Sequence, residues 1–335
     1  MATVTVVDRN NLDISAYVKL QKAAFGAILK AAKASDAYMK PEYYRWKFNP
    51  PAGLGRSAVV YENGELAASV TMIPQTIRFG GKSFRGWLFG DVATHPDFRG
   101  RGLFDLCLKG LETCYEENDF IYGLPNRNSI PGFIKVGWRL LTGVTTWFHP
   151  MPALFRHVSG DNPRIHEIAT VPEKKMDAYA EALVSEGRPM VVRNARYMKW
   201  RYFDHPFYHY SMLVFSDGSD PLAPGAHWRG MTVFRKASVK GRNWFIPMEI
   251  RGETPSVIRA LLFAAMEKAG VKPGEGGMML NTGIGLPTGL LSGFLPAPGK
   301  LMPKQQVLMG VSKGEASDVL YNDKWLIQTG DWDVF

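Results

Sequence analysis

The sequence predicts an α/β protein with two domains, each built on a mixed, mostly antiparallel sheet flanked by helices. The chain has 335 residues, about twice the size of a common single domain. Segments typical of antiparallel strands follow an initial helical segment, and the strand and helix pattern restarts after a proline-containing stretch. We therefore expect one domain at residues 1–150, a linker at 151–163 and a second domain at 164–335.

The composition is that of an ordinary globular protein with a large core, because 46% of the residues are hydrophobic and 21% are charged. The two cysteines, Cys107 and Cys114, lie seven residues apart in one expected helix, too far from each other to form a disulfide. Few cysteines and no disulfide framework indicate a cytoplasmic protein. The sequence contains no apolar run of about 18 residues, so we expect no membrane span.

The net charge of +9 is explained either by a solvated basic surface or by attraction for an anionic ligand. A small molecule with several phosphate groups would suit the second explanation. Dense lysine and arginine runs, zinc-finger spacing and RNA-binding motifs are missing from the sequence, so we expect no nucleic acid partner. The oligomeric state is left open.

The first half should begin with a strand at residues 3–8 and a helix at 12–33. Asn63-Gly64 is a strong signal for a hairpin turn, and Gly80-Gly81 marks another turn. The remaining expected elements are strands at 56–61, 66–73, 84–93, 120–124 and 138–148, and helices at 103–115 and 128–136.

The second half repeats this order loosely, without visible sequence identity, so we expect a degenerate duplication. The expected elements are strands at 165–171, 210–215, 227–234, 244–250, 278–281 and 306–311, and helices at 173–186 and 254–269.

A polar, glycine-rich loop joins a strand to a helix within residues 90–104, which read GDVATHPDFRGRGLF. Such a loop can turn its backbone N–H groups toward an anion, and the start of the helix adds unpaired donors and partial positive charge. Two arginines can neutralise phosphate oxygens. The residues concerned are Arg99, Gly100, Arg101, Gly102, Leu103 and Phe104.

Two common phosphate loops do not fit this stretch. A Walker loop needs Gly-Lys-Ser/Thr, which does not follow, and a dinucleotide-binding turn needs a third glycine where Asp105 stands. A basic turn without a ligand remains the alternative to a pyrophosphate site.

The order of elements and the loop resemble the GNAT acetyltransferase superfamily, whose loop reads Arg/Gln-x-x-Gly-x-Gly/Ala. Arg99 and Gly102 match this pattern, whereas Phe104 departs from the usual small residue. A downstream family motif ends in Gly-Phe and contains an asparagine and a tyrosine. Asn126 matches its asparagine, and Phe133 stands where the tyrosine is common.

The resemblance covers roughly residues 3–148 and implies acetyl-CoA as a co-substrate. The second half lacks a matching loop between its expected strand and helix, so we expect no second CoA there. The implied cofactor-binding residues are Val92, Ala93, Arg99, Gly100, Arg101, Gly102, Leu103, Phe104, Asn126 and Phe133.

The resemblance also implies direct attack of an amine on the thioester. A backbone N–H near Val92 or Ala93 would polarise the thioester carbonyl. Asp91 is the candidate general base, with a structural aspartate as the alternative. Because Phe133 has no proton to give, Tyr122 is the candidate acid, with a buried structural tyrosine as the alternative.

We therefore expect an N-acetyltransferase whose acceptor is a small amine, with an amino sugar as one candidate. The alternatives are an aminoacyl-tRNA-dependent peptidoglycan aminoacyltransferase and a non-catalytic acyl-CoA-binding protein. The aromatic and basic segment 193–210 serves either to dock the second domain or to bind the acceptor. The carboxyl end, residues 330–335, could supply Asp331 and Asp333 to the acceptor, although free ends are usually frayed.

Overall fold

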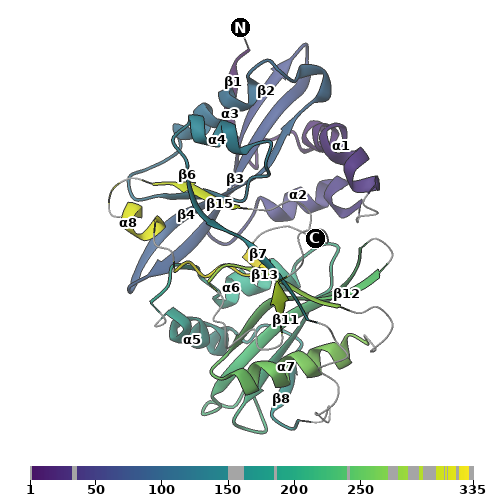
Figure 1. Cartoon of the computed structure of the whole chain (residues 1–335), viewed down its shortest axis with the longest axis vertical. Coiled ribbons are helices and arrows are strands. Elements are labelled where there is room, and N and C mark those ends of the chain that lie inside the picture. Colours follow the sequence, from purple (N-terminus) through teal and green to yellow (C-terminus); the bar gives the residue numbers. More distant parts are fainter. Residues whose placement is uncertain are drawn as a thin grey trace.

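Two β-sheets with helices packed against them form the protein, and this confirms the expected mixed α/β fold (Figure 1). The computed structural model describes residues 2–31, 36–149, 162–184, 187–239, 242–270, 278–285, 294–296, 307–312, 314, 316–321 and 324–331. The linker expected at 151–163 lies outside the described residues except for its last two positions.

The first sheet has the strand order β1-β2-β3-β4-β5-β15-β6, and the short strand β9 pairs with β3. All neighbours are antiparallel except β4 and β5, which run parallel. The strands are β1 (Val4–Asp8), β2 (Arg56–Glu62), β3 (Glu65–Phe79), β4 (Lys82–Thr94), β5 (Phe120–Gly123), β6 (Arg139–Gly143), β9 (Met190–Val191) and β15 (Val307–Val311).

The two predicted hairpin turns are confirmed. Asn63 and Gly64 both have positive φ angles, 51° and 80°, between β2 and β3. That pair of conformations suits the right-handed twist of the strands, and asparagine and glycine are the residues that adopt it most easily. Gly80 and Gly81, with φ angles of 55° and 78°, make the turn between β3 and β4.

Helices cover both faces of the first sheet. Successive side chains of a strand point to opposite faces, so apolar residues are available to pack against helices on each side. Val59 packs with α1 (Ile14–Ala31) and α2 (Pro41–Lys47), whereas Val60 packs with α3 (Leu103–Glu112). The short helix α4 (Ile130–Lys135) joins the α3 side through Phe133. The sequence did not predict α2 or the 3-10 turn η1 (Asp36–Met39) before it.

The second sheet has the order β14-β7-β13-β12-β11-β10-β8. In it α7 connects β12 to the parallel strand β13, as α3 connects β4 to β5 in the first sheet, so the second half repeats the central pattern of the first. The strands of the second sheet are β7 (Thr145–His149), β8 (Ile165–Ile168), β10 (Ser211–Ser216), β11 (Trp228–Val239), β12 (Arg242–Gly252), β13 (Met278–Gly283) and β14 (Leu295–Pro296). The helical elements described after residue 150 are α5 (Glu173–Val184), α6 (Ala195–Met198), the π-helix η4 (Lys199–Phe203), α7 (Pro255–Lys268), α8 (Ala316–Leu320), which contacts β5 and β15 of the first sheet, and the 3-10 turn η6 (Thr329–Asp331).

Each sheet takes strands from the other half of the chain: the second sheet takes β7, and the first takes β15 and the short strand β9. β7 leaves the first half and pairs with β13, whereas β15 returns from the second half and lies between β5 and β6. Figure 1 shows the yellow β15 in the upper sheet and the teal β7 in the lower one. The single strand predicted at 138–148 is therefore wrong, because the chain changes sheets at Val144.

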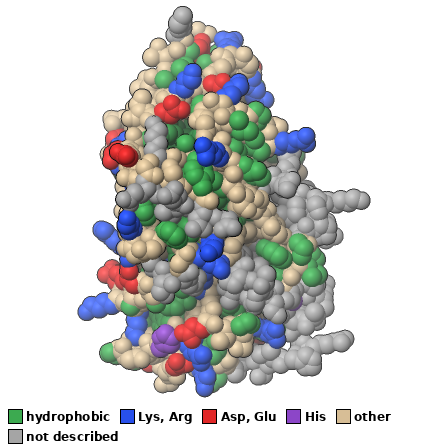
Figure 2. Space-filling model, turned by 60° about the vertical axis from the view of Figure 1, so that its left-hand side comes forward, with side chains coloured by type: hydrophobic (Ala, Val, Ile, Leu, Met, Phe, Trp, Pro, Cys, Tyr) green, Lys and Arg blue, Asp and Glu red, His purple; other side chains and the backbone are tan. Residues whose placement is uncertain are grey.

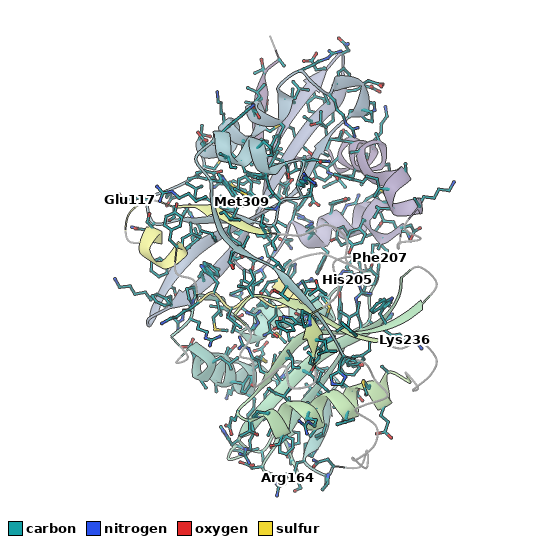
Figure 3. All side chains as sticks on the ribbon, viewed as in Figure 1. Glu117, Arg164, His205, Phe207, Lys236 and Met309 are labelled. Atoms are coloured by element: carbon teal, nitrogen blue, oxygen red, sulfur yellow. The ribbon has the colours of Figure 1, made fainter. Side chains whose placement is uncertain are left out.

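The halves meet through a buried core and an aromatic contact. The core includes Tyr122 from the first sheet and Trp228 from the second. Trp46 stacks on Trp200 at 5.2 Å between ring centroids, and each indole N–H donates to the other residue's carbonyl, at 2.7 and 3.0 Å. Figure 3 labels the neighbouring His205 at this junction. The segment 193–210 therefore docks the second half, as one of its two interpretations predicted.

Charged side chains of both signs are dispersed over the face drawn in Figure 2, with apolar side chains between them. A search of the described helices finds none with the length and hydropathy needed to cross a bilayer. Both cysteines are free, as their spacing predicted.

The exchange of strands makes the first sheet depend on a residue near the end of the chain. Met309 of β15, labelled in Figure 3, is 1% exposed and belongs to the α3-side core. We expect Met309→Ala to lower the free energy of unfolding by about 2–5 kcal/mol, because it leaves a cavity. Met309→Leu, which conserves volume, should cost less than about 1.5 kcal/mol. Denaturant unfolding measures both; equal midpoints for the alanine variant and the wild type would contradict the packing.

Candidate active site

The parallel strands β4 and β5 part after a short paired segment. They pair from Gly86 and Phe120 to Phe89 and Gly123, and there the ladder ends. Pro125 follows β5 and has no N–H to continue the pairing. Beyond this point the strands line a cavity of about 310 Å³ with residues 89–92 and 123–126.

A β-bulge lies in β4 beside this cavity. Thr71 of β3 pairs with Gly90, but Ser69 pairs with Ala93, so Asp91 and Val92 together face a single residue of β3. The φ angle of Asp91 is +50°, a left-handed conformation that is uncommon outside glycine and that asparagine and aspartate adopt more readily than other residues. A bulge leaves its extra residue outside the regular ladder, so main-chain N–H groups at Asp91 and Val92 are candidates to face a ligand.

Two helices hold the bulge residue. Lys47 of α2 places its Nζ 2.9 and 3.0 Å from the two carboxylate oxygens of Asp91. Gln21 of α1 donates its Nε2 hydrogen to the carbonyl oxygen of Asp91 at 3.3 Å. The side chains of Lys47 and Asp91 are only 7% and 16% exposed, so water screens their attraction weakly.

The wall of the cavity opposite α4 is largely apolar. Phe25 and Leu29 of α1 line it together with Tyr38 and Met39. Tyr44 also lines it, but its hydroxyl donates to the carbonyl oxygen of Tyr38 at 2.8 Å. The sequence prediction missed these residues, although the aromatic density of residues 38–48 was a visible signal.

The glycine-rich loop has the conformation expected of an anion nest. Gly100 and Gly102 have φ angles of 76° and 73°, and α3 begins directly after them at Leu103. No backbone hydrogen bond of the described loop uses the N–H groups of residues 102–104. Those groups are the unpaired donors that the start of a helix offers to an anion. Arg99 and Arg101 are both exposed beside them.

Phe104 is accommodated by a glycine in the facing helix. Its ring lies 5.5 Å from that of Phe133 in an edge-to-face contact. A Cβ atom on Gly132 would lie 2.2 Å from the Phe104 ring, so only glycine leaves room there. Because Phe133 lines the cavity, this contact joins the start of α3 to the gap between the strands.

The other predicted site residues occupy different places. Asn126 lines the cavity, and its Oδ1 accepts from the backbone N–H of Asn128 at 2.9 Å, so it also shapes the turn into α4. Ala93 is buried against α1 and α2 and does not line the cavity. Of the predicted residues, the structure brings Asp91, Val92, Asn126 and Phe133 together around the gap.

Tyr122 points away from the cavity. It is 1% exposed and packs in the core between the halves, where its ring contacts Trp325 at 5.7 Å. Burial, followed by the negative charge of Asp331, raises the pKa of Tyr122 well above its ordinary value. A phenol in this position would have to move before it could protonate a thiolate in the cavity.

Cys107 is equally unsuited to act as a nucleophile or a base. It is buried under the sheet in α3, and burial raises the pKa of its thiol to about 12, so it stays protonated at neutral pH.

A buried ionic cluster anchors the carboxyl end of the described chain. Arg193 donates from Nε to Glu249 at 2.7 Å and from Nη2 to Asp331 at 2.6 Å. Tyr202 donates to the other oxygen of Glu249 at 2.7 Å. Asp331 is therefore fixed in the second half, and Asp333 lies outside the described residues.

A small cavity of about 20 Å³ lies between this cluster and the bulge. Lys47 and Gln75 line it from the first half, and Arg201 and Asp331 line it from the second. The ammonium group that holds Asp91 therefore belongs to a side chain on the border between the two halves.

A family model matches the first part of this chain, and solved structures share its fold. The family described as an acetyltransferase (GNAT) domain matches residues 9–141, which contain the bulge, the loop and α4. A search of curated protein sequences finds no match.

Solved structures share the fold of nearly the whole chain at low sequence identity. A GCN5-related N-acetyltransferase from Kribbella flavida has a TM-score of 0.59 and 12% identity over 92% of this chain and 71% of its own. One from Anabaena variabilis has a TM-score of 0.58, 9% identity and coverages of 92% and 72%. The N-myristoyltransferase from Saccharomyces cerevisiae, with bound myristoyl-CoA, has a TM-score of 0.58, 10% identity and coverages of 93% and 84%.

Proposed function

The chain belongs to the GNAT superfamily of acyltransferases, and from that premise we propose that it transfers an acetyl group from acetyl-CoA to a small amine. The observation that carries this proposal is the gap between β4 and β5, with the bulge of Asp91 on one side and the glycine-rich loop close by. Both features suit a long ligand with a diphosphate at one end and a thioester at the other.

The loop is the proposed site of the diphosphate. Backbone N–H groups of residues 102–104 would bind its oxygens at the start of α3, where the helix dipole favours negative charge. Arg99 and Arg101 would neutralise the remaining charge. The arm of the ligand would then run past Phe133 into the gap.

The bulge is the proposed reaction centre. An amine attacks the carbonyl carbon of the thioester, and the carbon–sulfur bond breaks. The leaving thiolate takes a proton from a water molecule, and the proton that the amine gives up replaces it, so the net reaction moves one proton from nitrogen to sulfur. A main-chain N–H at Val92 would stabilise the negative oxygen of the tetrahedral intermediate. Asp91 is the proposed base that accepts the proton of the amine, directly or through water.

The acceptor is proposed to be an amine with an apolar body. The sequence suggested an amino sugar as one candidate. The wall formed by Phe25, Leu29, Tyr38 and Met39 favours an apolar or aromatic substituent instead, because it offers a sugar few hydrogen-bonding partners.

The proposed reaction takes place in the cytoplasm, which suits the free cysteines.

Calorimetry and a turnover assay test the proposal together. We expect acetyl-CoA to bind with a dissociation constant in the micromolar range and to be consumed with small apolar amines faster than with amino sugars. A series of acyl-CoA donors, from acetyl to myristoyl, tests the donor. Binding without turnover of any amine would favour a non-catalytic acyl-CoA-binding protein. RNA binding with steep salt dependence and no acetyl-CoA binding would favour an aminoacyl-tRNA-dependent enzyme.

Gly102→Glu should abolish acetyl-CoA binding. Its φ angle of 73° disfavours any side chain, and a carboxylate would repel the diphosphate. Gly102→Ala is the matched control, because it carries the backbone strain, about 1–2 kcal/mol, without the charge. Calorimetry measures the affinity for acetyl-CoA, and thermal unfolding measures the stability of each variant. Wild-type affinity in the glutamate variant would refute the proposed binding of the diphosphate by the glycine-rich loop.

Asp91→Asn should lower kcat by about 10²–10⁴-fold, the usual contribution of a general base, with little change in acetyl-CoA affinity. Steady-state kinetics across pH would measure the loss. If kcat against the best amine is unchanged, Asp91 is not the base.

A further inference from the structure

We infer that Lys47 is a positioning residue of the reaction centre: its ammonium group holds the bulge at Asp91 in its active shape from the border with the second half. This inference rests on the proposed function, because it names the residue that keeps the proposed main-chain donor and base in place.

Contacts around the bulge help to fix its shape. A φ angle of +50° costs a residue other than glycine about 1–3 kcal/mol, and aspartate lies toward the lower end because its short polar side chain tolerates this conformation. Lys47 binds both carboxylate oxygens of Asp91, and Gln21 binds its carbonyl oxygen. The side chain and the main chain of Asp91 are thus held from two different helices.

The burial of Lys47 indicates that its ammonium group has a specific role in orienting the carboxylate of Asp91. Lysine is almost never fully buried without a partner, because removing its charge from water costs several kcal/mol. Here α2 ends with a lysine whose side chain is 7% exposed, while Arg45 on the same helix keeps its side chain 53% exposed. An apolar residue would fill the space of Lys47 at lower cost, but it would not orient a carboxylate.

The second half of the chain completes the surroundings of Lys47. The 20 Å³ cavity beside it has room for about one water molecule and is lined by Arg201 and Asp331. Asp331 is fixed by Arg193, and Arg201 donates from Nε to the carbonyl oxygen of Gly330 at 2.8 Å. The docked half therefore sets the electrostatic environment in which Lys47 holds Asp91.

Lys47 lies between two structural features that come from different halves of the sequence. The gap between β4 and β5 belongs to the first half, and the polar cluster around Asp331 belongs to the second. A change in how the halves dock would move Lys47 and, with it, the donor at the bulge. This gives the second half a role in catalysis without a ligand of its own.

The test compares three variants of α2. We expect Lys47→Met to lower kcat by about 10²-fold, as loss of an oxyanion donor does, with the acetyl-CoA dissociation constant changed less than about two-fold. Lys47→Arg keeps the charge and should recover at least part of kcat. Arg45→Met, on the exposed face, should match the wild type.

A crystal structure of Lys47→Met gives a readout that does not need turnover. We expect Asp91 to leave its positive φ angle or its carboxylate to turn away. An unchanged bulge with wild-type kcat would overturn the inference, and so would equal loss of kcat in the methionine and arginine variants. If the wild type binds no acyl-CoA, the proposed function fails, whereas the bulge geometry still tests the hold by Lys47.

If Lys47→Met does not fold, Gln21→Leu replaces it. That variant removes the hydrogen bond to the Asp91 carbonyl and keeps the ion pair. We expect a loss of about ten-fold in kcat with intact acetyl-CoA binding. A wild-type kcat for Gln21→Leu, together with a loss of about 10²-fold in kcat for Lys47→Arg, would show that the contacts of Gln21 and Lys47 with Asp91 do not govern the reaction centre and would overturn the inference.

Discussion

The parting of β4 and β5 is the constraint on which the site depends. Two parallel strands in the middle of a sheet would normally pair along their whole length, and here the pairing of β4 with β5 ends at Phe89 and Gly123. A Cβ atom on Gly123 would lie 3.2 Å from the carbonyl oxygen of Phe89, so glycine permits the last close contact. Pro125 then removes a donor, and the bulge at Asp91 turns β4 away. The resulting opening lies between helices on both faces of the sheet.

The second half of the chain supports that opening from a distance. It returns β15 to close the first sheet beside β5, and it receives β7 in exchange. Its aromatic segment stacks Trp200 on Trp46, one residue before the lysine that holds Asp91. Neither sheet keeps its full set of strands without the other half, so a division of the chain near residue 150 describes the order of the sequence better than the order of the structure.

Local features were predictable and distant pairings were not. The hairpin at Asn63-Gly64 and the loop at Gly100 and Gly102 follow from backbone preferences of neighbouring residues, which a sequence displays directly. The exchange of β7 and β15 was hidden, because a strand pattern states that a segment pairs but not with which sheet. Tyr122 was chosen for its chemistry, yet alternation along β5 turns it toward the second half, and only the packing shows which face meets the cavity.

The most direct measurement is a crystal structure of the protein with a non-hydrolysable acetyl-CoA analogue. The account predicts diphosphate oxygens within hydrogen-bonding distance of the N–H groups of residues 102–104. It also predicts the carbonyl oxygen of the analogue beside the bulge, facing the main chain of Val92. Clear density for the diphosphate at any other part of the surface, or for the acyl group outside the gap between β4 and β5, would contradict it.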